Sequence, residues 1–291
     1  MTLHHNRASL IAFQGALGAY SDLACREVFP RRTTLPCADF EAAIAAVRRG
    51  RARYAMLPIE NSVAGRVADI HHLMPESGLH IIGEHFQRVN HHLLAPKGAS
   101  LKTLKVVRSH VHALSQCRRL IRELGLKAVV AADTAGAAAE VAERGDPTEA
   151  AIASALAGRI YGLASLKANI EDAEHNTTRF LVMSRTPQRA KRGSGLVVTT
   201  FVFRVRNVPA ALYKALGGFA TNGVNMTKLE SYMLGGRFTA TQFYADVEAH
   251  PDDRPLKLAL EELRFFSREV RILGVYPGHP FRHSATQDEA D

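Results

Sequence analysis

Four polar residues lie at the start of an apolar segment beyond the middle of the chain. Asn176, Thr177, Thr178 and Arg179 run directly into residues 180–183. That apolar run is typical of a strand buried on both faces, which would hold its first residues rigidly at the edge of a sheet. An amide, two hydroxyls and a guanidinium at such an edge can bind an anionic ligand, because all of them donate hydrogen bonds. The same residues can also form an ordinary turn with a solvated arginine.

A second polar group follows residues 54–59, which are predicted to form a strand. Glu60, Asn61 and Ser62 come directly after it, ahead of a predicted helix. Ligands in open α/β sheets bind outside the carboxyl ends of the strands, so these side chains belong to the ligand-binding edge. As purely structural residues, Ser62 can cap the helix and Asn61 can form a turn.

Further polar residues lie at later strand-to-helix junctions. A strand predicted at residues 104–107 leads to Ser109, which is in N-cap position for a helix that reaches residue 124 and contains Gln116. Asp133 is predicted to cap the next helix. All the conspicuous polar groups therefore fall where a strand meets a helix or a crevice.

The elements that position these residues alternate between strands and helices in two successive segments. An extended segment at residues 80–94 joins them. Such alternation predicts α/β lobes with mainly parallel sheets, and two lobes joined by extended crossovers enclose a cleft that suits a small anion.

The sequence pattern changes after residue 184. Residues 184–195 contain proline, glycine and four basic side chains, which predict a linker. Beyond it the predicted order is βαββαβ, with Gly235 and Gly236 in the hairpin turn. The polar residues 277–291 are predicted to be a disordered tail.

Composition restricts the class of protein. The 291 residues are 46% apolar and 22% charged, as in ordinary soluble proteins of two domains. No apolar run approaches the roughly 18 residues of a membrane span, and the N-terminus lacks a signal-peptide pattern, so we expect a cytoplasmic protein without membrane contact.

Charge and metal-binding residue types exclude other classes. The net charge of +9 comes from basic residues spread among glutamates. Since no motif combines them with aromatic residues, we expect no nucleic-acid partner. Cys25, Cys37 and Cys117 lack the spacing of a disulfide framework or a zinc site, and the side chains of neighbours such as His91 and His92 diverge. No metal site is predicted.

Together, these motifs resemble the prephenate dehydratase family, in its monofunctional bacterial form with a C-terminal ACT regulatory domain. The resemblance covers residues 10–276 and rests on five motifs in the family's order: QGALGAYS at 14–21, LPIENS at 57–62, SH through QC at 109–117, DTA at 133–135 and NTTRF at 176–180.

The resemblance implies a fold and its domain boundaries. It implies a catalytic domain at 8–185 with two lobes like those of type 2 periplasmic binding proteins and crossovers near 80–95 and 165–175. A ferredoxin-like ACT domain would follow at 196–276.

The resemblance also implies a reaction. The family converts prephenate to phenylpyruvate, water and CO2 in phenylalanine biosynthesis, without a metal or an organic cofactor. Thr178 would donate a proton to the leaving hydroxyl, while Asn61, Ser109 and Gln116 fix its hydrogen bonds. A threonine is a poor acid in water, so this role requires a closed, dry cleft.

The other motif residues are implied to bind the substrate. Arg179 would hold a carboxylate through paired N–H bonds, and Phe180 would anchor the strand or pack against the substrate ring. Backbone N–H groups around Ser21 and Ala135 would take the second carboxylate. The further implied binding residues are Glu60, Ser62, Thr134 and Thr177.

For the C-terminal domain, the resemblance implies a homodimer or homotetramer that binds L-phenylalanine as effector between subunits. The implied effector-binding residues are Asn207, Ala210, Ala211, Leu212, Asn225, Glu230 and Ser231. This chain departs from the family where Ala210 replaces a frequent glycine, Tyr232 and Met233 replace Arg-Pro, and Val111 and His112 replace proline and a polar residue.

Three alternatives remain open. An arogenate dehydratase would carry the same motifs, because arogenate differs from prephenate only by an amino group in place of a ketone. A two-lobed cleft can also serve a binding protein without catalysis, since fold does not fix function. The C-terminal domain could make the chain solely a phenylalanine sensor.

Overall fold

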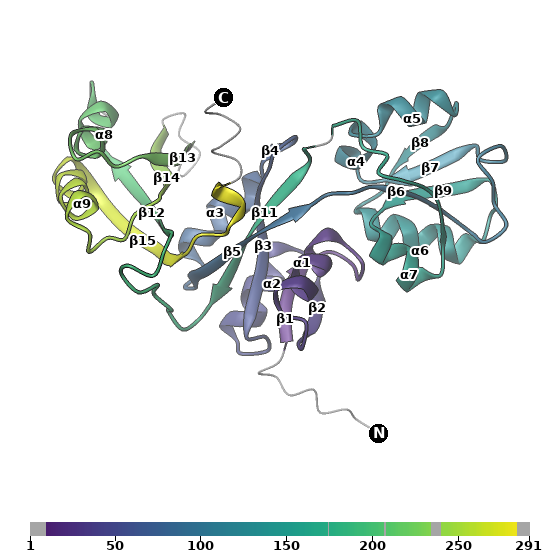
Figure 1. The fold of residues 1–291 in the computed structure, drawn as a ribbon, viewed down its shortest axis with the longest axis horizontal. Coiled ribbons are helices and arrows are strands. Elements are labelled where there is room, and N and C mark those ends of the chain that lie inside the picture. Colours follow the sequence, from purple (N-terminus) through teal and green to yellow (C-terminus); the bar gives the residue numbers. More distant parts are fainter. Residues whose placement is uncertain (1–9, 174, 207, 234–239, 284–291) are drawn as a thin grey trace. The chain divides into compact units, whose positions relative to one another are not determined.

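The computed structural model describes residues 10–173, 175–206, 208–233 and 240–283. The chain divides into two compact units, and each unit is assembled from two segments of the sequence (Figure 1). The first unit comprises Met1–Ile70 and His85–Phe180, and the second comprises His71–Glu84 and Leu181–Asp291. The second unit thus takes residues 71–84 from within the range predicted for the catalytic domain.

The first lobe of the first unit is built around strand β1, whose three central residues are fully buried. Three of its elements, α3, β5 and β11, contain the points at which the chain passes between the two units. β1 pairs in parallel with β2 and β3, and the strand order is β2-β1-β3-β11-β5, with β4 beside β3. The strands are β1 Leu10–Gln14, β2 Thr33–Cys37, β3 Tyr54–Asn61, β4 Gly65–Arg66, β5 His80–Arg88 and β11 Thr177–Ser184; the helices are α1 Tyr20–Val28, α2 Phe40–Arg48 and α3 Ala68–Glu76.

The second lobe contains a separate sheet of order β10-β6-β9-β7-β8. β7 is parallel to β8 and β9, whereas β6 is antiparallel to β9 and β10. The strands are β6 His92–Ala95, β7 Val106–Ser109, β8 Lys127–Val130, β9 Glu149–Ala153 and β10 Ala164–Ala168; the helices are α4 Val111–Ser115, α5 Arg118–Glu123, α6 Thr134–Arg144 and α7 Ala155–Tyr161. The sheets are thus mixed, and the expectation of mainly parallel sheets fails where the chain crosses between lobes.

Local capping explains where several helices begin and end. The side chain of Asp39 accepts a hydrogen bond from Ala42 N at the start of α2, and Asp133 does the same for Gly136 N at the start of α6. Gly145 ends α6 in the left-handed conformation that glycine favours. The prediction that Ser109 is an N-cap is wrong, because Ser109 ends β7 and His110 caps α4.

The two lobes of the first unit meet at Gly18. Ser154 Oγ donates to Gly18 O at 2.5 Å, and Tyr161 Oη donates to Leu17 O at 2.9 Å. A Cβ atom at Gly18 would lie 2.7 Å from Ala157 Cα, and Gly18 has a φ of +90°. Only glycine allows this approach, which holds the lobes together beside the cleft.

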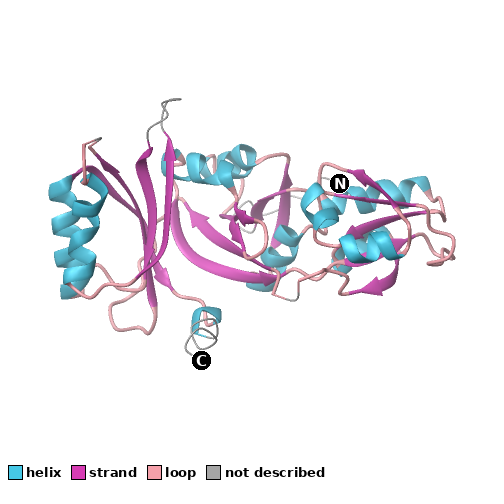
Figure 2. Ribbon diagram, turned by 90° about the horizontal axis from the view of Figure 1, so that it is seen from above, coloured by secondary structure: helices cyan, strands magenta, loops and turns pink. Residues whose placement is uncertain are grey.

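The second unit has the predicted βαββαβ order. Its antiparallel strands follow the order β13-β14-β12-β15, and α8 and α9 cover one face (Figure 2). The elements are β12 Val197–Val205, α8 Ala211–Thr221, β13 Met226–Met233, β14 Ala240–Val247, α9 Arg254–Phe266 and β15 Ser267–Pro277. The predicted turn at Gly235 and Gly236 lies outside the described residues.

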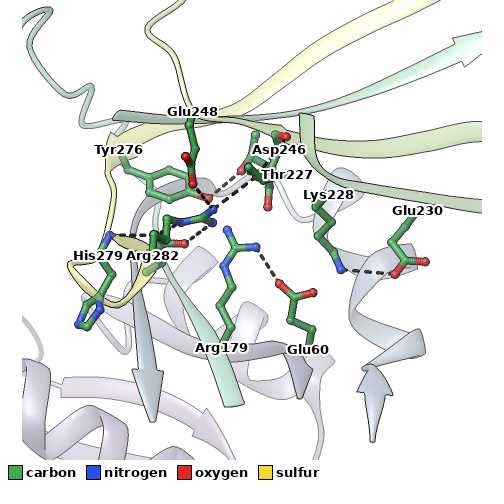
Figure 3. A network of polar contacts seen from close by, with 12 residues as sticks. Glu60, Arg179, Thr227, Lys228, Glu230, Asp246, Glu248, Tyr276, His279 and Arg282 are labelled. Carbon is green, nitrogen blue, oxygen red and sulfur yellow. Dashed lines mark hydrogen bonds and ion pairs between the residues drawn. The ribbon is translucent and has the colours of Figure 1, made fainter. Parts of the chain in front are cut away.

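Residues beyond β15 are ordered as far as the structure describes them, so the predicted disorder of 277–291 is wrong for residues 277–283. Arg282 forms two hydrogen bonds with Glu84, Nε to Oε1 at 2.7 Å and Nη2 to Oε2 at 2.9 Å. Arg282 also reaches Glu248 at 3.0 Å (Figure 3). The Glu84 side chain is fully buried, which explains why this segment folds back.

Candidate active site

A cleft of about 570 Å³ lies between the two lobes of the first unit. Amide and hydroxyl side chains on its wall belong to Gln14, Tyr20, Asn61, Gln116, Thr134 and Thr178, and basic side chains belong to Arg66, His91, His110 and His112. Three of the four residues predicted to be catalytic, Asn61, Gln116 and Thr178, therefore share one cavity. The wall is otherwise largely apolar, and Asp69 is a carboxylate on it. The cleft can still accept an anion, because most of its polar side chains can donate hydrogen bonds.

Thr178 receives a hydrogen bond from Asn61. Asn61 Nδ2 lies 2.9 Å from Thr178 Oγ1, and Asn61 Oδ1 accepts the backbone N–H groups of Val63 and Ala64 at 3.0 and 2.8 Å. Those two backbone donors fix the amide orientation, since only its oxygen can accept them. Thr178 Oγ1 therefore acts as an acceptor toward Asn61, and its own hydrogen is available to a molecule in the cleft.

A chain of buried polar side chains continues from Asn61 across the cleft. Asn61 Nδ2 donates to Asn176 Oδ1 at 2.8 Å, and Asn176 Nδ2 donates to Gln116 Oε1 at 2.9 Å. Gln116 Oε1 lies 3.0 Å from His91 Nε2, and His91 Nδ1 lies 3.0 Å from Tyr20 Oη. Gln116, at the end of α4, is thus tied to the start of β11.

Burial sets the charge of this chain. It lowers the pKa of His91, although the hydrogen bond with Gln116 and the nearby Glu171 carboxylate act in the opposite direction. Burial also raises the pKa of Tyr20 well above its ordinary value. Both groups are therefore neutral near neutral pH.

Ser62 and Thr177 fix the backbone at the start of β11. Ser62 Oγ donates to His175 O at 2.6 Å and accepts from Thr177 N at 2.9 Å. Ser62 N donates to Thr177 O at 2.9 Å. These bonds hold Thr178 in place, while the Ser62 and Thr177 side chains are absent from the cleft lining among the described residues.

Arg179 and Glu60 pair with each other on the other face of the strands. Arg179 Nη1 donates to Glu60 Oε1 at 2.9 Å (Figure 3). The guanidinium also lies 5.9 Å from the Phe86 ring centroid, and only 4% of the Arg179 side chain is exposed. Because successive strand residues face opposite sides, Arg179 points away from the face of Thr178. This geometry does not support the predicted carboxylate contact.

Of the remaining predicted residues, most are buried and only Thr134 lines the described cleft. Ser109 is fully buried and donates from Oγ to Ile152 O at 2.6 Å, so its hydroxyl supports the sheet of the second lobe. Phe180 is 1% exposed, which agrees with a strand anchor. Ser21 and Ala135 are buried behind the wall, and Thr134 lines it.

Several residues that line the cleft were missed by reasoning from the sequence. Tyr20 was within a recognised motif, but nothing in the local sequence indicated that it meets His91. His91 was considered only as half of an adjacent pair. His110 and His112, whose ring centroids lie 5.1 Å apart, reach the cleft because α4 begins directly after β7.

The described residues lack two features, a metal-binding cluster and a membrane-spanning helix. Among the described residues there is no group of three or more His, Cys, Asp or Glu side chains that could hold a metal ion. Within the same residues, no helix combines the length and apolar character of a bilayer span. Asn207, one of the residues predicted to bind the effector, lies outside the described part of the chain.

Comparison with known proteins identifies a family. Residues 11–188 match the family model described as prephenate dehydratase. The chain is 57% identical over 277 residues to a Komagataeibacter europaeus protein named bifunctional N-acyl-homoserine lactone acylase/prephenate dehydratase, which covers 95% of this chain and 99% of that protein. It is 38% identical to arogenate dehydratase/prephenate dehydratase 2 of Arabidopsis thaliana, over 92% of this chain and 72% of the plant protein.

Solved structures agree with this result. One described as a novel type of quorum-quenching acylase is 58% identical, with a TM-score of 0.88 over 94% of this chain and 99% of that chain. A prephenate dehydratase from Arthrobacter aurescens, solved in complex with L-Phe, is 33% identical, with a TM-score of 0.84 over 92% of this chain and 89% of that chain. Both similarities extend through the two units described above.

Proposed function

The chain belongs to the prephenate dehydratase family of hydro-lyases, and we propose that it converts prephenate to phenylpyruvate, water and CO2 with Thr178 as the proton donor. The observation that carries this proposal is the hydrogen bond from Asn61 Nδ2 to Thr178 Oγ1 at the wall of the cleft. It leaves the Thr178 hydrogen as the donor toward a bound substrate. It also supports the oxygen as that hydrogen leaves.

The chemistry requires one proton and two bond cleavages. The bond between C4 and its hydroxyl breaks as Thr178 transfers its proton, so the oxygen leaves as water. The bond between the ring and its carboxylate breaks to release CO2, and that electron pair completes the aromatic ring. The Thr178 oxygen then regains a proton from solvent. Because aromatisation drives the reaction, the protein has mainly to orient the dianion and stabilise the threonine oxygen.

Basic side chains on the cleft wall suit the two substrate carboxylates. Arg66 lies in β4, while His110 and His112 lie at the start of α4 in the opposite lobe. Burial lowers the pKa of His110, the His112 charge acts in the same direction, and a carboxylate bound beside it would raise that pKa again. Together these groups provide hydrogen-bond donors from both lobes, and the Arg66 guanidinium carries a positive charge.

One assay tests the proposed reaction directly. Purified full-length protein is mixed with prephenate, and phenylpyruvate is followed by its absorbance, with Thr178→Ala as the control. We expect turnover in the wild type that is lost in the variant. Absence of turnover in the wild type would refute the assignment. The plant relative carries the names of both activities. Comparison of kcat/KM for prephenate and for arogenate under the same conditions shows which substrate is preferred.

The C-terminal module is proposed to bind L-phenylalanine and to reduce activity. The Arthrobacter aurescens complex with L-Phe supports this, because its similarity covers 92% of this chain. Strand β13 is at the edge of the module's sheet and is available to a second copy of the chain in a homodimer or homotetramer. Inhibition by added phenylalanine, together with mass measurement in solution, tests both statements.

Hydrolysis of an N-acyl-homoserine lactone is a second candidate function, favoured by the 57% identity to the bifunctional relative. Among the side chains of the described cleft, His110, His112 and Asp69 are candidates for activating a water. The thiols of Cys25 and Cys117 are poor candidates for the nucleophile, because burial raises the pKa of each. Release of free homoserine lactone from an acylated one would establish this activity, and its absence would exclude it.

A further inference from the structure

The series of side-chain hydrogen bonds between Asn61 and His91 has a donor-to-acceptor direction that the backbone imposes. Val63 N and Ala64 N both donate to Asn61 Oδ1, so Asn61 Nδ2 must face the other way. That nitrogen can only donate, and it meets Asn176 Oδ1 as well as Thr178 Oγ1. The orientation of the Asn176 amide follows from that of Asn61.

The same logic extends to the imidazole. Asn176 turns its amide nitrogen toward Gln116 Oε1 because its oxygen is engaged by Asn61. Gln116 Oε1 also meets His91 Nε2 at 3.0 Å. Because Gln116 Oε1 can only accept, a hydrogen bond between the two atoms requires a hydrogen on His91 Nε2. A neutral His91 must therefore carry its hydrogen on Nε2 and use Nδ1 to accept.

Tyr20 completes the arrangement, and we propose that the Tyr20–His91 pair is a positioning device for the proton donor. By holding His91 in its Nε2–H tautomer, the pair fixes the Gln116 amide and, through Asn176 and Asn61, keeps the Thr178 hydrogen directed at the substrate. This rests on the proposed function, in which Thr178 is the acid. Neither Tyr20 nor His91 needs to exchange a proton with substrate in this role.

The opposite tautomer would disrupt every link between His91 and Asn61, although its Nδ1–H could donate to Tyr20 Oη. A lone pair on His91 Nε2 would face the Gln116 oxygen, and reversing the Gln116 amide would set its N–H group against the N–H of Asn176. Reversing Asn176 in turn would set two nitrogen donors together at Asn61. Asn61 cannot reverse without breaking its bonds to Val63 N and Ala64 N. The chain therefore has one consistent polarity.

The surroundings of His91 hold the ring in place. Its ring meets the Tyr20 ring edge-on, with centroids 5.5 Å apart. Tyr20 Oη donates to Asn90 O at 2.7 Å, so in the Nε2–H tautomer its single hydrogen is shared between Asn90 O and His91 Nδ1. The backbone N–H of His91 donates to Glu171 Oε2 at 2.8 Å. His91 is only 2% exposed, and the titratable groups that face it are Tyr20, Glu171 and His92.

The device draws on both lobes of the first unit. Tyr20 comes from α1 and Asn61 from β3 in the first lobe, whereas Gln116 comes from the end of α4 in the second. His91 and Asn176 lie on the two segments that cross between the lobes. The directed hydroxyl is therefore assembled only when the lobes are together, which couples closure to the readiness of the acid.

The tautomer can be measured without reference to activity. Nitrogen-15 NMR of the imidazoles in the full-length protein distinguishes protonated from unprotonated ring nitrogens, and comparison with His91→Gln assigns the resonances. We expect a hydrogen on Nε2 and none on Nδ1 near neutral pH. A hydrogen on Nδ1 alone would overturn the proposal.

Kinetics then test the link to Thr178. His91→Leu removes the donor to Gln116, and we expect kcat to fall on the order of 10²-fold with little change in KM, as for a displaced catalytic group. His91→Gln should recover most of kcat, because its amide nitrogen can occupy the place of Nε2, and Tyr20→Phe should lower kcat by a smaller factor. The matched control is His92→Leu, since His92 contacts Ser165 rather than Gln116, and it should behave as wild type.

The outcomes separate the two proposals. Equal kinetics in His91→Leu and His92→Leu would overturn the positioning role, as would a His91→Gln variant no better than His91→Leu. If His91→Leu does not fold, Tyr20→Phe and the tautomer decide the question. A wild-type protein without dehydratase activity would contradict the proposed function, while the tautomer measurement would still test the polarity of the chain.

Discussion

Arg179 donates a hydrogen bond to Glu60 over 2.9 Å, on the strand faces opposite those of Thr178 and Asn61. Consecutive residues of β3 and β11 thus form two pairs, one on each face of the strands. One face of β3 and β11 carries the Asn61–Thr178 pair at the cleft, and the other carries an ion pair in which 4% of the arginine and 32% of the glutamate side chain are exposed. The pair can fix the strand register that brings Asn61 to Thr178.

This relationship predicts a stability effect at Arg179 rather than a loss of substrate affinity. Arg179→Met leaves the Glu60 carboxylate, which is 32% exposed, without this partner, so we expect a loss of about 1–3 kcal/mol in the free energy of unfolding, measured in urea. The double variant Arg179→Met/Glu60→Gln should recover much of it, with KM close to wild type. A strong rise of KM in both variants at unchanged stability would show instead that Arg179 binds a substrate carboxylate.

Substitution of Thr178 should affect catalysis without unfolding the protein. Thr178→Ala removes the proposed proton donor, and we expect kcat to fall by about 10²- to 10⁴-fold, with prephenate binding measured by calorimetry largely retained. Thr178→Ser is the matched control, because its hydroxyl can still accept from Asn61 and donate to substrate. If the alanine variant turns over at the wild-type rate, Thr178 is not the acid.

Local signals in the sequence predicted the elements well. Asp39 and Asp133 cap their helices as expected, because an N-cap is decided by a side chain and a backbone N–H three residues away. The βαββαβ order of the C-terminal module follows equally from periodicity and turn residues. Asn61 and Thr178 lie together because their strands, β3 and β11, are neighbours in one sheet, whereas the convergence of Gln116 with them was implied only by the family resemblance.

Long-range pairing was beyond the reach of these signals. The sequence does not show that Arg179 faces Glu60 rather than the cleft, because one residue of strand register decides this. Ser109 was misjudged because its hydroxyl bonds to Ile152 O, 43 residues away. The contact of Tyr20 with His91 and the return of Arg282 to Glu84 likewise depend on tertiary packing.

The Arg282–Glu84 pair should stabilise the second unit. Glu84 is fully buried and accepts from Arg282 and from His279 N, so Arg282→Met removes the charged partner of a buried carboxylate. We expect a loss of about 3–5 kcal/mol in unfolding free energy, and Glu84→Gln in the same chain should restore part of it. Arg268→Met, an exposed arginine of β15, serves as control. Equal stability of the Arg282 and Arg268 variants would exclude this role.

Buried histidines predict a loss of stability in mild acid. Burial lowers the pKa of His91, and it also lowers that of His92 and of His110. In the unfolded chain the pKa of a histidine is about 6.5. At pH values between the folded and the unfolded pKa, the unfolded chain therefore binds more protons than the folded protein. Unfolding free energy should therefore rise with pH through this window and fall below about pH 6.5. Thermal denaturation measures it, and His91→Gln should flatten the profile. A profile that is unchanged in the variant would contradict this assignment.

Ala210 carries the last prediction, because it adopts a left-handed conformation, with φ 60° and ψ 15°, immediately before α8. A side chain in this conformation costs about 1–2 kcal/mol that glycine avoids. Ala210→Gly should therefore raise the unfolding free energy in urea by about 1 kcal/mol, whereas Ala220→Gly within α8 should lower it by about 1 kcal/mol.

If the loop before α8 also binds phenylalanine as proposed, Ala210→Gly should reduce the phenylalanine concentration needed for half-inhibition, because it removes a methyl group and strain from the site. Ala220→Gly should leave that concentration unchanged. Identical inhibition in both variants and the wild type, or no inhibition in any of them, would remove this loop from the proposed effector site while leaving the backbone argument to be judged by stability alone.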